Sequence, residues 1–186
     1  MQKILFVSHC ILNTAAKVVL YEEEAARNEE ALRLRFVSEA VKQGIQFVQL
    51  PCPEFTLYGA CRWGHVSDQF DTPFFREHCR KILHPVILQL EEYAAHPERF
   101  EILSIVGVDG SPSCGVDYTC YGDWYGSFEG RKNLDKTLST GRLGRGKGIF
   151  FDEFCKMLKE AGLERIPVTA LYAGEEEKCL SLLAPR

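Results

Sequence analysis

Short apolar runs alternate with longer amphipathic stretches along this chain. Four of the runs have the length and the β-branched or aromatic content that favour strands, and they cover residues 3–9, 44–50, 101–108 and 166–171. We therefore predict four strands, separated by segments long enough to return the chain to the same edge of a sheet.

The segments between these runs carry helical patterns. Residues 21–42 are rich in Ala, Glu, Leu and Arg, which favour a helix. A second helix is predicted over 73–90, where Pro85 interrupts the apolar spacing and should cause a kink or a break into two helices. A third is predicted from about residue 152 to 160. Strands that alternate with such helices predict a layered α/β sandwich with a mainly parallel, Rossmann-like sheet.

The length of the chain and one unusual segment define the expected domain organisation. At 186 residues the chain fits a single domain spanning 1–186. The glycine-rich segment at about 109–148 has little periodicity, so it predicts a long loop of the kind that often binds ligands. A polar tail follows the last predicted strand.

The composition indicates where the protein is located and which classes of partner it binds. No apolar stretch approaches the roughly 20 residues of a membrane-spanning helix, and the chain enters a strand at once, so we expect a cytoplasmic protein without a membrane partner. The net charge of −4 argues against general nucleic-acid binding. A local exception is 131–147, with six basic residues and one acidic residue, where a tRNA contact or simply a solvated loop is expected.

Three cysteines, Cys10, Cys52 and Cys114, each follow one of the predicted strands. The carboxyl ends of parallel strands converge on one crevice, so these thiols should converge as well. The cytoplasm keeps thiols reduced, which points away from disulfides. Three thiolates without a fourth at a matching position suggest a metal or iron–sulfur cluster with one open coordination site.

The chain has eight cysteines, and the other five allow a second interpretation. Cys79 and Cys155 lie on apolar helix stripes and are interpreted as core residues, and Cys179 lies in the tail without an expected role. Cys61 or Cys120 could add a fourth ligand, although both could equally be small loop residues. A four-cysteine zinc or Fe–S site would make the chain a non-catalytic metal-binding domain.

The order of these motifs resembles the thiouracil desulfidase (TudS) family. The resemblance rests on a cysteine near the N-terminus, on Cys52-Pro-Glu54 and on Ser111-Pro-Ser-Cys-Gly115. It implies a [4Fe-4S] cluster with three cysteine ligands, Cys10, Cys52 and Cys114, and one open iron that takes sulfur from a thiolated pyrimidine. The substrate could be free thiouracil, a nucleotide or a tRNA thiouridine. The chain differs from many members after Cys10, so a related cluster enzyme with another substrate also remains open.

Residues beside these cysteines supply the other groups that such chemistry needs. An open iron acts as a Lewis acid on the C=S bond, and hydrolysis then requires an acid–base group. We predict Glu54 for this role, with Ser111 and Ser113 hydrogen-bonding the cluster or the substrate. Asn13, Lys17 and Trp63 are predicted to bind the substrate, the last by stacking on a base. The alternatives are a surface glutamate, turn-forming serines and an aromatic core residue.

Overall fold

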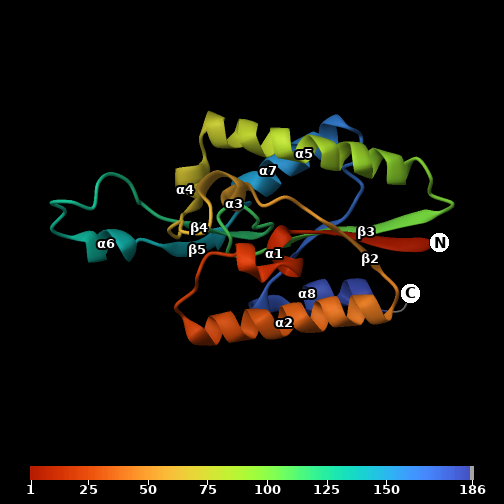
Figure 1. Ribbon diagram of the computed structural model, residues 1–186, viewed down its shortest axis with the longest axis horizontal. Helices are drawn as coiled ribbons and strands as arrows, with labels where there is room; N and C mark the ends of the chain where they lie inside the picture. The colour runs from red at the N-terminus through yellow and green to blue at the C-terminus, as the bar shows by residue number, and fades with distance from the viewer. Residues whose placement is uncertain (185–186) are drawn as a thin grey trace.

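The computed structural model describes residues 1–184 and has a four-stranded parallel sheet at its centre (Figure 1). The strands are β1 (Gln2–Val7), β2 (Gln46–Gln49), β3 (Phe100–Val108) and β6 (Val168–Leu171). They lie in the order β2-β1-β3-β6, and every pairing among them is parallel. The predicted α/β fold with a mainly parallel, Rossmann-like sheet is confirmed, and each strand overlaps a predicted run.

Helices cover both faces of this sheet. Helices α5 (Pro73–Ala94) and α7 (Ile149–Glu160) lie on one side, and α2 (Glu23–Lys42) and α8 (Glu176–Leu180) lie on the other (Figure 1). Shorter helices occupy the connections: α1 (His9–Leu12), α3 (Pro53–Tyr58), α4 (Ser67–Phe70) and the 3₁₀ turns η1 (Thr14–Ala16), η2 (Ala173–Glu175) and η3 (Ser181–Leu183). Within residues 1–184 no helix is both long and apolar enough to cross a membrane.

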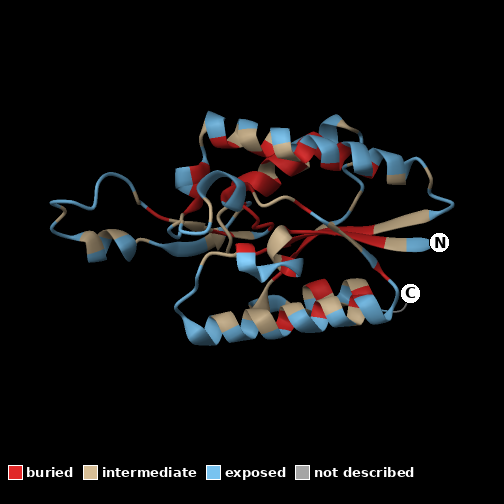
Figure 2. Ribbon diagram, viewed as in Figure 1, coloured by how far each residue is buried: buried red, intermediate tan, exposed pale blue. Residues whose placement is uncertain are grey.

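Two hydrophobic cores lie on the two faces of the sheet, as the buried strands and helix faces in Figure 2 show. Phe6 and Ile105 belong to the core under α5 and α7, whereas Leu5 and Val106 belong to the core over α2. Successive strand side chains point to opposite faces, so both faces are apolar and the strands read as continuous apolar runs.

Helix α5 runs without a break through Pro85, so of the predicted kink or break into two helices the break is wrong. Its start is well defined because the Thr72 side chain accepts a hydrogen bond from the N–H of Phe75 at 3.2 Å, with Pro73 in the first turn. Buried side chains before and after Pro85 belong to the same core, including Leu83 and Val86. This shared packing offsets the hydrogen bond that proline cannot donate.

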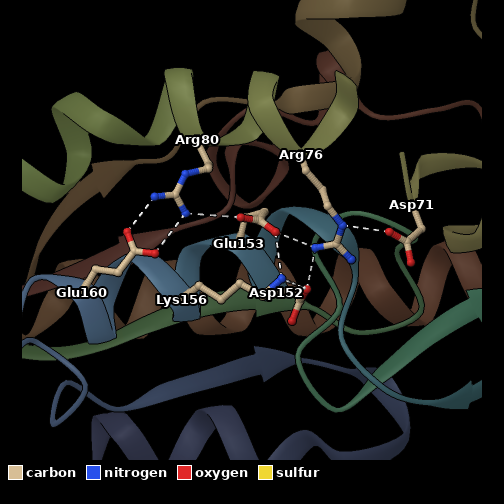
Figure 3. Close-up of polar contacts among 7 residues, drawn as sticks. All are labelled: Asp71, Arg76, Arg80, Asp152, Glu153, Lys156 and Glu160. Atoms are coloured by element: carbon tan, nitrogen blue, oxygen red, sulfur yellow. Dashed lines mark hydrogen bonds and ion pairs between the residues drawn. The ribbon is translucent and has the colours of Figure 1, made fainter. Parts of the chain in front are cut away.

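A network of ion pairs joins α5 to α7 (Figure 3). The Arg76 guanidinium contacts Asp71, Asp152 and Glu153 at 2.7, 2.6 and 2.5 Å. Its remaining members, Arg80, Lys156 and Glu160, extend the network along both helices. The Glu153 side chain is only 6% exposed, so its charge depends on these cations for compensation.

The glycine-rich segment contains more structure than the predicted loop. Strands β4 (Tyr118–Tyr121) and β5 (Arg142–Arg145) pair antiparallel, and α6 (Leu134–Leu138) lies between them in sequence. Figure 1 shows α6 at the end of the molecule opposite both chain termini. The tail also differs from expectation, because Cys179 of α8 is fully buried in the core that α2 covers.

Candidate active site

The structure brings Cys10, Cys52 and Cys114 to one cavity of about 320 Å³. Cys10 lies in α1, directly after β1, and Cys52 is the N-cap of α3, after β2. Cys114 lies in the segment that follows β3. The three strands end at the same edge of the sheet, so their following residues meet there.

Local hydrogen bonds fix two of these thiols. The Cys52 sulfur accepts the N–H of Phe55 at 3.3 Å, which places it at the first turn of α3. The Ser111 hydroxyl accepts the N–H groups of Ser113 at 3.3 Å and Cys114 at 3.0 Å. Ser111 therefore organises the turn that carries the third cysteine, as serine commonly does in tight turns.

The protein environment alone does not favour thiolates here. Burial raises the pKa of the Cys10 thiol to about 12, against the opposing effect of the Lys17 charge. Burial also raises the pKa of Cys52, and it raises that of Cys114 well above the usual value, with the nearby Cys10 and Cys52 contributing. Burial and the mutual effect of Cys10, Cys52 and Cys114 therefore disfavour the thiolate forms, which a bound metal cation would stabilise.

Glu54 and Ser113 form a hydrogen-bonded chain that leads to Cys114. The Ser113 hydroxyl lies 2.5 Å from Oε1 of Glu54 and 3.6 Å from Sγ of Cys114. Glu54 and Ser113 are buried, and both line the cysteine cavity. The structure thus places a carboxylate and a hydroxyl next to a predicted ligand.

Arg62 compensates the buried charge of Glu54. Its Nε lies 3.2 Å from Oε2 of Glu54, and the two side chains are 3% and 10% exposed. The same guanidinium donates to the carbonyls of Gly59 at 3.1 Å and Ala16 at 2.7 Å, so it joins the segments after β1 and after α3. Arg62 was not predicted as a site residue, because a single arginine carries no motif until the fold places it beside Glu54.

Asp109 anchors the segment that follows β3. Its Oδ1 accepts the N–H groups of Val116, Asp117 and Tyr118 at 2.8, 2.9 and 3.2 Å. The other oxygen, Oδ2, is buried and has no hydrogen-bond partner within residues 1–184. Asp109 and His65 both line the cysteine cavity, and burial lowers the pKa of His65.

Close backbone contact also shapes this wall of the cavity. A Cβ at Gly148 would lie 2.4 Å from the carbonyl carbon of Ser113, and one at Gly107 would lie 2.4 Å from the carbonyl oxygen of Cys114. The start of α7 therefore packs directly on the cysteine-bearing turn. Only glycine permits such an approach without displacing the backbone.

The remaining predicted site residues occupy different places. Ser111 and Lys17 line the cysteine cavity, and Nζ of Lys17 forms an ion pair with Glu29 of α2. Asn13 does not line it; its side chain instead accepts the N–H of Ala15 at 3.1 Å and caps η1. Trp63 lines a neighbouring aromatic cavity.

The donor set fits a cluster with three protein thiolates. Within residues 1–184 no three His, Cys, Asp or Glu side chains are arranged to share a single metal ion. The three converging thiols supply the soft ligands that iron–sulfur clusters require, and a cluster spreads its ligands further apart than one ion does. Cys120 of β4 also lines the cavity, whereas the exposed Cys61 does not.

A comparison with curated proteins found one archaeal relative. The chain is 34% identical over 116 residues to a protein of Methanocaldococcus jannaschii named "Uncharacterized protein MJ0003". The matched region covers 62% of this chain and 69% of the archaeal protein. No family model matches the chain, and no solved structure matches it.

Proposed function

We propose that this chain, which belongs to the family of the archaeal protein MJ0003, is an iron–sulfur-dependent desulfidase. Its substrate would be a thiolated pyrimidine, either free or within a nucleotide or tRNA. The overall reaction is a hydrolysis, in which water supplies the oxygen of the new carbonyl group and sulfur leaves as hydrogen sulfide. No net electron transfer is required.

One observation carries this proposal. Three cysteines from three strand ends line a cavity with Glu54, whose carboxylate contacts Ser113 beside Cys114. A cluster held by Cys10, Cys52 and Cys114 would supply an open iron that binds and polarises the thiocarbonyl sulfur. Soft ligands and an acid–base group in one partly closed cavity are the combination that hydrolytic desulfuration needs.

The chain's own groups then have distinct roles. Glu54 accepts a proton from the attacking water and passes it to the departing sulfur, so that both protons of the water leave in hydrogen sulfide. Ser113 holds the Glu54 carboxylate through its 2.5 Å hydrogen bond, while Ser111 maintains the turn. Lys17, at the cavity wall and paired with Glu29, donates a hydrogen bond from its ammonium group to a substrate carbonyl or phosphate.

The first test measures iron and acid-labile sulfide on protein purified and reconstituted without oxygen. About four irons per chain are expected, and changing Cys10, Cys52 or Cys114 to Ser should remove most of them. Cys155→Ser is the matched control, because Cys155 lies on α7 and does not line the cavity. Iron retained in all three variants would contradict the ligand assignment.

A second measurement separates cluster binding from chemistry. Glu54→Gln should keep its iron but lower sulfide release from 2-thiouracil or 4-thiouridine by roughly 100-fold or more, the usual contribution of a general acid–base group. Unchanged sulfide release would exclude Glu54 from the reaction. An iron-loaded wild type that releases sulfide from neither substrate would favour a related cluster enzyme with another substrate.

A second candidate function follows from Cys120. Because this cysteine shares the cavity, it could complete a four-thiolate zinc or Fe–S site without an open position. If the wild type contained zinc instead of iron and the Cys120→Ser variant lost this zinc, the result would support a non-catalytic metal-binding function. A tRNA contact through 131–147 is a further part of the proposal, supported by the exposed basic residues Lys132, Lys136, Arg142, Arg145 and Lys147.

A further inference from the structure

A second cavity, of about 450 Å³, lies next to the cysteine cavity and is lined mainly by aromatic and apolar side chains. Both tryptophans of the chain, Trp63 and Trp124, line it, together with Tyr125 and Phe128. Gly64 and His65 belong to the walls of both cavities. The two cavities are therefore neighbours with a shared wall.

The aromatic side chains of this pocket are unusually open to solvent. Trp63 is 74% exposed, Tyr125 76% and Phe128 55%, and the rings of Trp63 and Phe128 meet edge to face with 5.8 Å between centroids. Grouped large aromatic side chains on a surface mark a binding site rather than a core. Their flat faces suit a planar ring.

Polar groups at this pocket indicate what kind of ring it accepts. The polar side chains of Gln69, Arg131 and Thr137 belong to its wall. Arg131 lies over the Tyr125 ring, with its Cζ 5.5 Å from the centroid. The pocket thus offers aromatic faces together with hydrogen-bonding groups, which suits a heteroaromatic base better than a hydrocarbon ring.

The surrounding segment supplies positive charge. None of the six basic residues in 131–147 forms an ion pair with a carboxylate of residues 1–184; they are Arg131, Lys132, Lys136, Arg142, Arg145 and Lys147. Aromatic faces bordered by unpaired cations are the arrangement by which proteins bind single-stranded nucleic acids.

We propose that this aromatic pocket binds a nucleobase of single-stranded RNA, next to the base that enters the cysteine cavity. The second part rests on the proposed function, because it assumes that the cysteine cavity takes a base. The shared wall of Gly64 and His65 places the two bases as neighbours on one strand. The substrate is then a polynucleotide rather than a free base.

The test uses the full-length chain and RNA that contains no sulfur. Because both tryptophans line the pocket, a uridine pentanucleotide should quench the intrinsic tryptophan fluorescence, and added salt should weaken this binding. UMP should bind at least tenfold more weakly, since it lacks the neighbouring base, and ribose 5-phosphate should leave the fluorescence unchanged. Equal affinities for UMP and the pentanucleotide would overturn the second base site.

Variants test the assignment of the pocket by anisotropy of a labelled pentanucleotide. Phe128→Ala should weaken binding roughly tenfold through lost stacking. Phe74→Ala is the matched control, because Phe74 is 88% exposed on α5 and lies outside the pocket. Equal effects of the two variants, or no RNA binding by the wild type, would overturn the inference. Iron content of the wild type and of the Cys10, Cys52 and Cys114 variants tests the proposed function separately, because cluster binding does not depend on which substrate enters the cavity.

Discussion

At the scale of single residues, the buried pair of Glu54 and Arg62 makes the sharpest prediction about stability. Arg62→Ala leaves a buried carboxylate without its cation, so the free energy of unfolding should fall by about 3 kcal/mol. The measurement is urea unfolding. Glu54→Gln in the Arg62→Ala background should recover part of the loss, because the uncompensated charge is then absent.

A matched arginine, Arg27, tests whether burial causes the loss of stability expected for Arg62→Ala. Arg27 also pairs with a glutamate, Glu23, but the two side chains are 69% and 83% exposed. Exposed pairs contribute little, so Arg27→Ala should leave the unfolding midpoint nearly unchanged. If both arginine variants lost the same stability, burial of the Glu54 pair would not be what makes it matter.

Residues whose location follows from their position after a strand could be predicted from the sequence. Cys10, Cys52 and Cys114 were of this kind, because the apolar runs before them are readable. Arg62 was not, since its contact with Glu54 joins segments that only the fold brings together. Asn13 illustrates a competing local role, because its side chain caps η1 instead of lining the cavity.

At the scale of elements, Pro85 within α5 makes a second prediction. An interior proline destabilises a helix by about 3 kcal/mol. Replacing it also increases the conformational entropy of the unfolded chain, which lowers the free energy of unfolding by about 1 kcal/mol. Pro85 is exposed, so no core contact is lost. Pro85→Ala should therefore raise the free energy of unfolding by about 1–2 kcal/mol in thermal or urea unfolding.

Pro73 of the same helix is the control for this prediction. It lies in the first turn of α5, where a backbone N–H has no acceptor within the helix, so the missing N–H of proline costs no hydrogen bond. Pro73→Ala should leave stability unchanged or lower it slightly. A gain at Pro73 as large as that at Pro85 would show that the position of proline within the helix is not the cause.

The elements that the sequence predicted well are those with a long apolar signal. The four parallel strands are continuous apolar runs and the three long helices have a helical period, and the structure contains all of them. The hairpin β4–β5 was predicted as loop, because its two strands are only four residues each and lie in a glycine-rich segment. The same limit applies to α8, whose five residues are too few for periodicity to show.

At the scale of the whole molecule, the ion pairs between α5 and α7 connect the core to the cysteine cavity. Helix α7 contacts the cysteine-bearing turn directly, because the N–H of Phe151 donates to the carbonyl of Ser113 at 3.2 Å. The Arg76 network holds this helix against α5 (Figure 3). Loosening the network should therefore affect both stability and the cavity.

The network also predicts how stability depends on pH. Burial alone would raise the pKa of Asp152 and Glu153, but hydrogen bonds from Lys156 and Arg76 outweigh it and lower the pKa of both. A carboxylate with a lowered pKa in the folded state stabilises the protein above its unfolded pKa, near 4, and this contribution disappears as pH falls through the folded value. Acid should therefore remove part of the stability below about pH 4.

Arg76→Met tests this pH dependence across the whole molecule. At pH 7 the variant should lose about 1–2 kcal/mol, between the values for exposed and buried pairs. Acid protonates Asp152 and Glu153 and so removes the ion pairs of Arg76 from the wild type as well. The difference in free energy of unfolding between wild type and variant should therefore shrink below about pH 4. Unfolding by urea at a series of pH values measures both.

Lys42→Met, which breaks the exposed pair with Glu39, is the control and should show no such convergence. A difference between wild type and Arg76→Met that stayed constant from pH 7 to pH 3 would mean that lost packing of the arginine stem, and not its charge, holds α5 against α7.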